Sequence, residues 1–327
     1  MNARFSFTET PFFSTIYRGV AMNKLVVQCC CLLMLLLAIG CQQTESVSSK
    51  GPKVVATHDK TFLIGLIPEQ NIFKQMERYK PIANYLSKRI NMPISLTAFP
   101  RYGNIVHNFT SMRLDGAFFG SFTYALTHTK LSVEVLARPL SLNGTSTYQG
   151  LIFVRKDSGI KSVDQMKGKR FAFVDKATTA GYLLPLAYFE EHGKDYKNFL
   201  KESYFAGTHE DAILAVLNRK ANIGAAKNTV FERLAASDDR INKELVILAR
   251  SPEVPENALA VRKDLDDSVK KKLRKALLTM HEDSEGSAIL KAFGARMFIQ
   301  TSDTDYEPVY RYAQQMELNL ATYDYMN

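Results

Sequence analysis

Short apolar runs alternate with stretches in which apolar residues recur every three or four positions, beginning at residue 61. The runs predict buried strands and the wider spacing predicts amphipathic helices. Proline suits the first turn of a helix, so Pro81 is expected to open one. The predicted strands cover residues 61–67, 94–98 and 116–119, and the predicted helices residues 81–90 and 105–112. This alternation indicates βαβ units on a mostly parallel sheet.

The same alternation restarts after Tyr148, which indicates a second α/β lobe. Ser162 and Gln165 have the spacing of a capping box that opens a short helix before Gly168. Pro185 lies inside another helical stretch, so that helix should start late or bend. The strands predicted here cover residues 151–154, 170–174, 223–226, 245–248 and 258–261, and the longer helices residues 180–191 and 209–218.

The N-terminal segment has the pattern of an export signal. Residues 25–39 after Lys24 form an uncharged run of 15 residues, shorter than the roughly 20 apolar residues that span a bilayer. Met22 is a better signal start than Met1, so residues 1–21 are interpreted as an over-long gene start and 22–40 as a signal peptide. An uncleaved signal anchor is the alternative.

Ala38-Ile39-Gly40-Cys41 resembles the lipobox of bacterial lipoproteins. The resemblance implies cleavage before Cys41 and lipidation of its thiol. Residues 41–60 would then be a lipidated cysteine followed by a flexible polar tether. All four cysteines lie within the first 41 residues, so the rest of the chain can form no disulfide among its own residues.

Charge and composition narrow the functional classes. The chain has 42 Lys and Arg against 33 Asp and Glu, and without residues 1–41 its net charge is +7. This excess suits anionic ligands without requiring them. Lys270, Lys271 and Lys272 are expected on the solvated face of a helix. The chain has no Trp and no interleaving of aromatic with basic residues, so nucleic-acid binding is not expected.

Two predicted helix N-termini carry the candidate site. Thr178 and Thr179 lie between a buried strand and a helix, where free N–H groups and the helix dipole suit a compact oxyanion. A simple N-cap is the alternative interpretation. Thr208 with Asp211 forms a variant capping box that places His209 in a first helical turn, where it could donate to an anion without a permanent charge. The alternative is a surface histidine beside a cap.

A third polar position follows the strand predicted at 223–226. Lys227 and Asn228 stand at the carboxyl end of that strand, and ligands of open α/β sheets bind outside such strand ends. The sequence therefore predicts that several loops converge on one ligand cleft.

Several segments together resemble the phosphate/phosphite/phosphonate-binding family of ABC-transporter substrate-binding lipoproteins. The matching segments are residues 99–102, 118–124, 158–169, 175–185, 207–210 and 251–255. The resemblance implies an α/β type 2 periplasmic binding fold with the ligand between two lobes. Lobe 1 would comprise residues 61–149 plus 250–327 and lobe 2 residues 150–249, with hinge crossings near 148–151 and 248–251.

The resemblance also implies site residues. Thr178 and Thr179 match the first two residues of the family's Ser-Thr-Ser, and the other expected contacts are Tyr102, Thr123, Tyr124, His209, Glu210, Lys227 and Asn228. Ala180 replaces the third hydroxyl and Lys176 the preceding proline, while Phe119 stands where some relatives have a contacting tyrosine. Lys227 would repel a ligand ammonium and attract a dianion, which favours phosphate or phosphite over an amino-phosphonate.

Enzyme motifs are missing from the sequence, and the six histidines form no close pair of metal ligands. No catalytic residue, metal or cofactor is therefore expected, although a spatially assembled triad stays open. The predicted function is a monomeric lipid-anchored receptor on the extracytoplasmic face of a bacterial membrane, which passes a small oxyanion to an ABC permease and ATPase. The alternatives are a receptor for a sensor kinase or cyclase, and a receptor for a sulfonate or an organic ligand.

Overall fold

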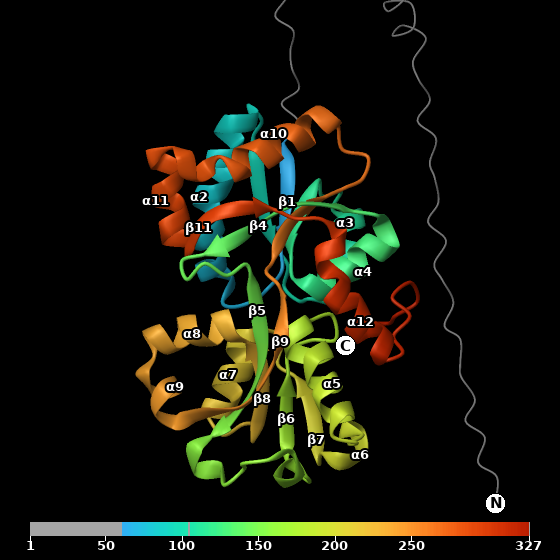
Figure 1. Ribbon diagram of the computed structural model, residues 1–327. Helices are drawn as coiled ribbons and strands as arrows, with labels where there is room; N and C mark the ends of the chain where they lie inside the picture. Colours follow the sequence, from blue (N-terminus) through green and yellow to red (C-terminus); the bar gives the residue numbers. More distant parts are fainter. Residues whose placement is uncertain (1–60, 104, 327) are drawn as a thin grey trace, which may run out of the picture. The chain divides into compact units, whose positions relative to one another are not determined.

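The computed structural model describes residues 61–103 and 105–326. The predicted signal peptide, Cys41 and the tether lie outside the described residues. Within the described part of the chain, the helices and strands form two lobes, each built on its own sheet (Figure 1). No helix in this part is both long and apolar enough to cross a bilayer.

The first lobe contains a six-stranded sheet in the order β11-β4-β10-β3-β1-β2. Its strands are β1 Phe62–Leu66, β2 Ile94–Ala98, β3 Gly116–Phe119, β4 Glu134–Ser141, β10 Ala258–Val261 and β11 Ala295–Gln300. Its helices are α2 Ile72–Ile90, α3 Ile105–Ser111, α4 Ser121–Leu131, α10 Asp267–Leu278 and α11 Ser284–Phe293.

The second lobe contains a five-stranded sheet in the order β7-β6-β8-β5-β9. Its strands are β5 Thr147–Arg155, β6 Arg170–Phe173, β7 Glu202–Phe205, β8 Ile223–Lys227 and β9 Leu245–Pro255. Its helices are α5 Leu184–Glu191, α6 Tyr196–Phe199, α7 His209–Leu217, α8 Asn228–Ser237 and α9 Asp239–Glu244.

Both sheets are mixed, whereas the sequence pattern predicted a mostly parallel arrangement. The pairs β1–β2, β1–β3, β6–β7 and β6–β8 are parallel, as expected for strands linked by helices. The strands β5, β9 and β10 pair antiparallel with their neighbours. These three strands belong to the segments that pass between the lobes, so no helical crossover forces them to run parallel.

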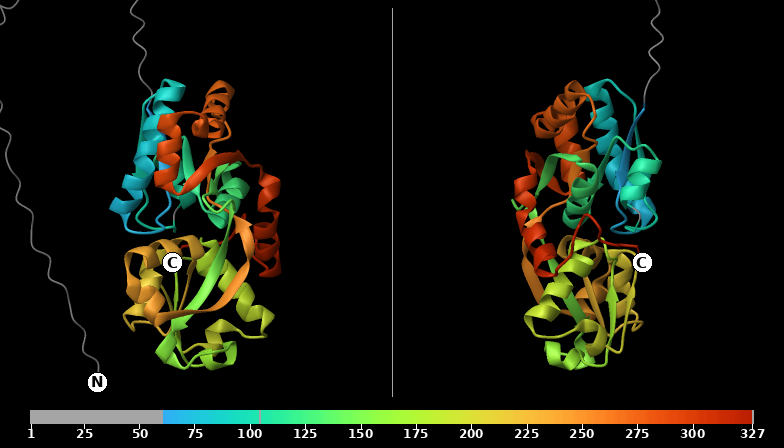
Figure 2. Two further views of the ribbon diagram at one scale, coloured as in Figure 1. Left: turned by 60° about the vertical axis from the view of Figure 1, so that its left-hand side comes forward. Right: turned by 90° about the vertical axis from the view of Figure 1, so that its right-hand side faces the viewer.

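Two long strands connect the lobes. β5 and β9 pair along nearly their whole length, from Thr147 opposite Pro255 to Arg155 opposite Leu245. Both views in Figure 2 show this green and orange ribbon running between the lobes. Helix α12, Glu307–Gln315, packs against α4 of the first lobe and α5 of the second, so the C-terminal segment contacts both lobes.

Of the two helix features predicted from prolines, one is wrong and one is confirmed. The helix expected to begin at Pro81 begins at Ile72, because the Asn71 side chain accepts from the backbone N–H groups of Phe73 and Lys74 and caps it there. Pro81 lies inside this helix, so that prediction was wrong. The late start expected from Pro185 is confirmed: α5 begins at Leu184 after a π-helical turn, Thr179–Leu183, and the proline occupies the first turn of α5.

Two further predictions on side chains were wrong. Ser162 precedes a 3₁₀ helix, Val163–Met166, without a side-chain capping bond, and the Gln165 side chain accepts from the N–H of Lys161 rather than forming the reciprocal bond of a capping box. Lys270 is buried rather than solvated, since its ammonium bonds Glu134 and the carbonyl oxygen of Lys263.

Candidate functional site

The carboxyl ends of parallel strands from both lobes meet at one small buried cavity. From the first lobe come Glu69 after β1, Tyr102 after β2 and Thr123 after β3. The second lobe contributes Thr178 and Thr179 after β6, together with His209 after β7 and Lys227 at the end of β8. Strand ends of open α/β sheets point their loops the same way, which explains why residues so distant in sequence converge.

The lobe 2 wall is a helix N-terminus. The π-helical turn starts at Thr179, and the first N–H groups of any helix have no acceptor within it. Thr178 donates its hydroxyl to the carbonyl oxygen of Asp175 at 2.6 Å, which fixes the turn. Gly181 packs so closely on Val174 that a Cβ would overlap the valine side chain. The start of the helix is therefore seated directly on the end of β6.

A second helix N-terminus, that of α4, faces it from lobe 1. The Thr179 hydroxyl accepts from the N–H of Phe122 at 2.9 Å, so one lobe caps a helix of the other. Thr123 lines the cavity, and its hydroxyl donates to the carbonyl oxygen of Gly120 at 2.9 Å. Two opposed helix starts give the cavity a positive potential without a free cation.

Tyr102 supplies a donor that nothing in the described chain uses. Its side chain is only 2% exposed, and its hydroxyl has no hydrogen-bond partner among residues 61–103 and 105–326. Burial is the main reason that the pKa of Tyr102 lies well above its usual value, so the hydroxyl keeps its proton. A buried polar atom without a partner costs free energy, which makes this hydroxyl a donor available to a ligand.

His209 is a second neutral donor at the cavity. Its Nδ1 accepts from the backbone N–H of Lys227 at 3.2 Å, which assigns the proton to Nε2. Burial lowers the pKa of His209 to about 4, although Glu69 opposes this shift. The ring is therefore uncharged at neutral pH and packs edge-on against Tyr102, with 6.1 Å between ring centroids.

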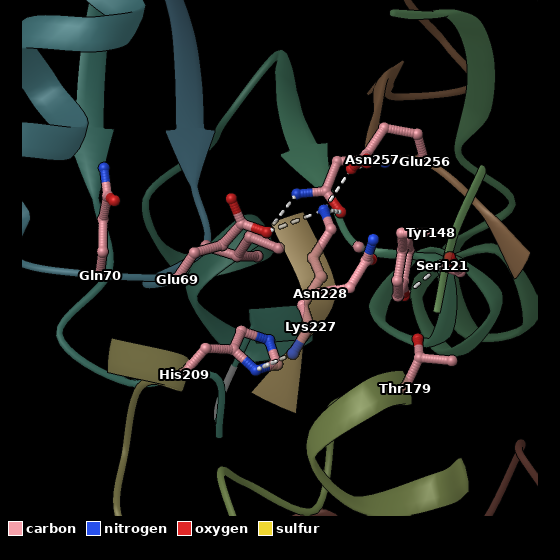
Figure 3. Close-up of polar contacts among 12 residues, drawn as sticks. Glu69, Gln70, Ser121, Tyr148, Thr179, His209, Lys227, Asn228, Glu256 and Asn257 are labelled. Atoms are coloured by element: carbon pink, nitrogen blue, oxygen red, sulfur yellow. Dashed lines mark hydrogen bonds and ion pairs between the residues drawn. The ribbon is translucent and has the colours of Figure 1, made fainter. Parts of the chain in front are cut away.

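Lys227 forms a buried ionic cluster that joins the lobes (Figure 3). Its ammonium donates to Glu69 Oε1 and Asn257 Oδ1, both at 3.0 Å, and to a Glu256 carboxylate oxygen. The same ammonium lies 4.4 Å from the centroid of the Tyr148 ring, which adds a cation–π contact. These five residues, Glu69, Tyr148, Lys227, Glu256 and Asn257, are called the Lys227 cluster below.

The charges of the Lys227 cluster stabilise one another. Burial alone would raise the pKa of Glu69, but the neighbouring Lys227 and Arg233 outweigh it and lower that pKa to about 2. Burial would likewise lower the pKa of Lys227, but Glu256 and Glu69 raise it above its usual value. Both groups are therefore ionised at neutral pH, and the Lys227 ammonium is fully engaged by its acceptors.

Three of the residues expected at the ligand do not line this cavity. Tyr124 donates to Asp303 Oδ1 at 3.0 Å on the other side of α4. Glu210 accepts from the N–H of Asn71 at 2.8 Å, where it joins the N-terminus of α2 to the second lobe. Asn228 accepts from the N–H of Gln149 at 2.9 Å, beside the connecting strands. Each of the three is engaged in a structural contact.

Sequence reasoning missed the partners of Lys227. Glu69 lies two residues after the first predicted strand, so its place near a strand end was a signal that the sequence offered. Glu256 and Asn257 stand in the short link between β9 and β10, and no local pattern marks them. Lys227 contacts Glu69 across 158 residues of chain, and Glu256 and Asn257 across 29 and 30 residues, so the cluster depends on the fold.

The cavity is small and rich in donors. Its volume of about 10 Å³ is the space of about one water molecule. Neutral donors and two helix starts suit a compact anion. Among the described residues, no group of three or more His, Cys, Asp or Glu side chains could hold a metal ion.

Comparison with known proteins gives one family. The family model described as "ABC transporter, phosphonate, periplasmic substrate-binding protein" matches residues 64–306. The phosphonates-binding periplasmic protein of Escherichia coli K12 is 23% identical over 271 residues, covering 82% of this chain and 80% of that protein. A probable ABC transporter phosphite-binding protein of Prochlorococcus marinus is 24% identical over 270 residues, covering 78% and 89%.

Solved structures have the same fold. The binding protein component of an ABC phosphonate transporter from Pseudomonas aeruginosa superposes with a TM-score of 0.74 at 22% identity, covering 79% of this chain and 86% of that one. PhnD1 of Prochlorococcus marinus, solved with methylphosphonate, gives a TM-score of 0.72 at 21% identity, with 79% and 99% covered. The described chain therefore has the type 2 periplasmic binding fold.

Proposed function

Because this chain belongs to the family of periplasmic substrate-binding proteins of phosphonate ABC transporters, we propose that it captures a small phosphorus oxyanion between its lobes. Members of this family are binding proteins rather than enzymes. The ligands proposed are phosphate, phosphite or a phosphonate with a small substituent.

The observation that carries this proposal is the Tyr102 hydroxyl, which has no partner among the described residues and lies in a cavity between two helix N-termini. An oxyanion there would accept from Tyr102, from His209 Nε2 and from the first N–H groups of the π-helical turn. Hydrogen bonds to a charged acceptor stabilise a complex more than neutral ones do, by about 1.5–3 kcal/mol each. The donors come from both lobes, so a bound anion would hold the lobes together.

The size of the cavity supports a compact ligand. Its present volume of about 10 Å³ leaves no room for an extended organic molecule without separation of the lobes. A tetrahedral oxyanion would need a small opening about the β5–β9 connection. Such hinge closure around a ligand is the usual mode of periplasmic binding proteins.

The proposed cellular role is delivery of the bound anion to an ABC permease. Lipidation at Cys41 would anchor the protein at the extracytoplasmic face of the membrane, within reach of that permease. Cys41→Ser should release the protein from the membrane fraction, and Cys29→Ser serves as the matched control. Retention of the Cys41 variant in the membrane fraction would favour an uncleaved anchor.

A thermal-unfolding panel tests the ligand class. It comprises phosphate, phosphite, methylphosphonate, sulfate and taurine, each added to the protein without its predicted signal peptide. A ligand at 100 times its dissociation constant stabilises the folded state by about 2.7 kcal/mol, which raises the midpoint by a few degrees. Stabilisation by a phosphorus oxyanion supports the proposal. Stabilisation by taurine alone would assign a sulfonate instead.

A further inference from the structure

Two of the spaces between the lobes share a common wall. The small cavity has a volume of about 10 Å³, and a neighbouring chamber has a volume of about 390 Å³. Both are lined by Glu69, Lys227 and Asn257. These residues belong to the Lys227 cluster, which therefore separates the anion cavity from the larger space.

The partners of Lys227 have the chemistry of an alkylammonium site. Two carboxylates and an amide oxygen accept from the ammonium, and the Tyr148 ring lies beneath it at 4.4 Å. Carboxylates and an aromatic face are the groups that recognise an organic ammonium in proteins. In this chain the occupant of the site is an ammonium tethered to β8, and its side chain is only 4% exposed.

We propose that Lys227 determines ligand specificity by filling, with its own ammonium, a cation subsite beside the anion cavity. The tethered ammonium closes the wall between the chambers and leaves no carboxylate free for a ligand amine. The protein would therefore bind compact phosphorus oxyanions and discriminate against phosphonates with an amino group. This inference rests on the proposed function, because it concerns the same site.

Truncation of the lysine should reverse the selectivity. Lys227→Ala leaves Glu69 and Glu256 without their cation and connects the cavity with the larger chamber. The phosphonate group of 2-aminoethylphosphonate could then occupy the anion cavity while its ammonium takes the place of the lysine. Methylphosphonate carries the same phosphonate group without an amine, so it is the matched comparison ligand.

Calorimetric titration of both ligands tests the inference. The wild type should bind methylphosphonate more tightly, and Lys227→Ala should shift the affinity ratio toward 2-aminoethylphosphonate by about 10-fold to 100-fold, as expected for hydrogen bonds to a charged group. Lys74→Ala is the control, since it removes an interlobe lysine, paired with Glu210 at 3.6 Å, outside the cluster. It should leave the ratio unchanged.

Two results would overturn the inference. One is a wild type that binds both ligands equally, and the other is an unchanged ratio in a folded Lys227→Ala variant. If the single variant fails to fold, the double variant Lys227→Ala, Glu256→Gln carries one unpaired carboxylate fewer and should still shift the ratio. A wild type that binds methylphosphonate without any shift in the variants would refute this inference alone. A wild type that binds no phosphorus oxyanion would refute the proposed function as well.

Discussion

Burial and neighbouring charges determine which side chains of this cleft are charged at neutral pH. His209 is held neutral by burial, whereas Glu69 and Lys227 are held ionised by each other. The cavity therefore offers neutral donors to an anion, while the two charged groups are occupied at its wall. The sequence alone could place these residue types near one another, but their protonation depends on neighbours brought together by the fold.

Acidification should destabilise the protein through His209. The unfolded histidine takes up a proton near its ordinary pKa of 6.5, whereas the folded one does so only near about 4. The free energy of unfolding that the neutral histidine contributes is therefore present above about pH 6.5 and is lost as the pH falls from there toward 4. The loss is about 2 kcal/mol between pH 7 and pH 5. Glu69 adds a further loss of stability only as the pH falls from about 4.5 to about 2.

Urea denaturation at pH 7 and pH 5 measures the His209 effect. His209→Gln keeps a neutral polar side chain but has no group that titrates, so its stability should change less between the two pH values. An equal change in both proteins would exclude His209 as the source.

Thr179 provides a second test at the scale of one side chain. Its hydroxyl joins the lobes by accepting from the N–H of Phe122, beside the proposed oxyanion site. Thr179→Ala should weaken oxyanion binding by about 1–3 kcal/mol in calorimetry. Thr127→Ala is the control, because that hydroxyl bonds the carbonyl oxygen of Thr123 within α4 and does not line the cavity. Equal affinities of the wild type and Thr179→Ala would contradict this assignment.

Among the elements, those with a strong local signal were predictable. The strands expected at 116–119, 170–174 and 223–226 are present as β3, β6 and β8, because each is a short apolar run between polar segments. The start of α2 was missed, since its Asn71 cap lies ten residues before the first position predicted as helical. The antiparallel strands could not be inferred from periodicity, because strand direction depends on how the chain passes between the lobes.

The seat of the π-helical turn on β6 gives a prediction at the scale of an element. A methyl group at Gly181 would overlap Val174, so Gly181→Ala should displace the helix start and lower stability by about 1–3 kcal/mol. It should also weaken oxyanion binding. Gly103→Ala is the control, because the atoms nearest to an added methyl group there are 3.7 Å away and leave room for it. Thermal unfolding that gives equal midpoints for both variants would refute this packing argument.

The two lobes are held together by contacts at several places around the cleft. Glu210 meets the N-terminus of α2, Asp175 accepts from the N–H of Gly103 at 3.2 Å, and the Lys227 cluster lies between them. Sequence reasoning anticipated two lobes and a cleft from the restarting βαβ pattern. It could not identify these contacts, because each joins residues far apart in the chain.

The C-terminal segment should favour the closed arrangement. Ala321 accepts from Lys130 of the first lobe at 2.7 Å, and the Tyr323 hydroxyl donates to the carbonyl oxygen of Lys176 in the second at 3.1 Å. Deletion of residues 319–327 should therefore increase the radius of gyration of the unliganded protein in small-angle X-ray scattering. Saturating methylphosphonate should reduce the difference. An unchanged radius without ligand would show that these contacts do not hold the lobes together.

The central claim is that unpartnered donors in the cleft bind a phosphorus oxyanion, and a titration of methylphosphonate into the wild type and Tyr102→Phe tests it most directly. The variant keeps the ring against His209 and removes only the hydroxyl that has no partner in the described chain. The account predicts measurable binding to the wild type and a loss of about 10-fold to 100-fold in the variant. Equal affinity of the two proteins, or no binding to a folded wild type, would contradict it.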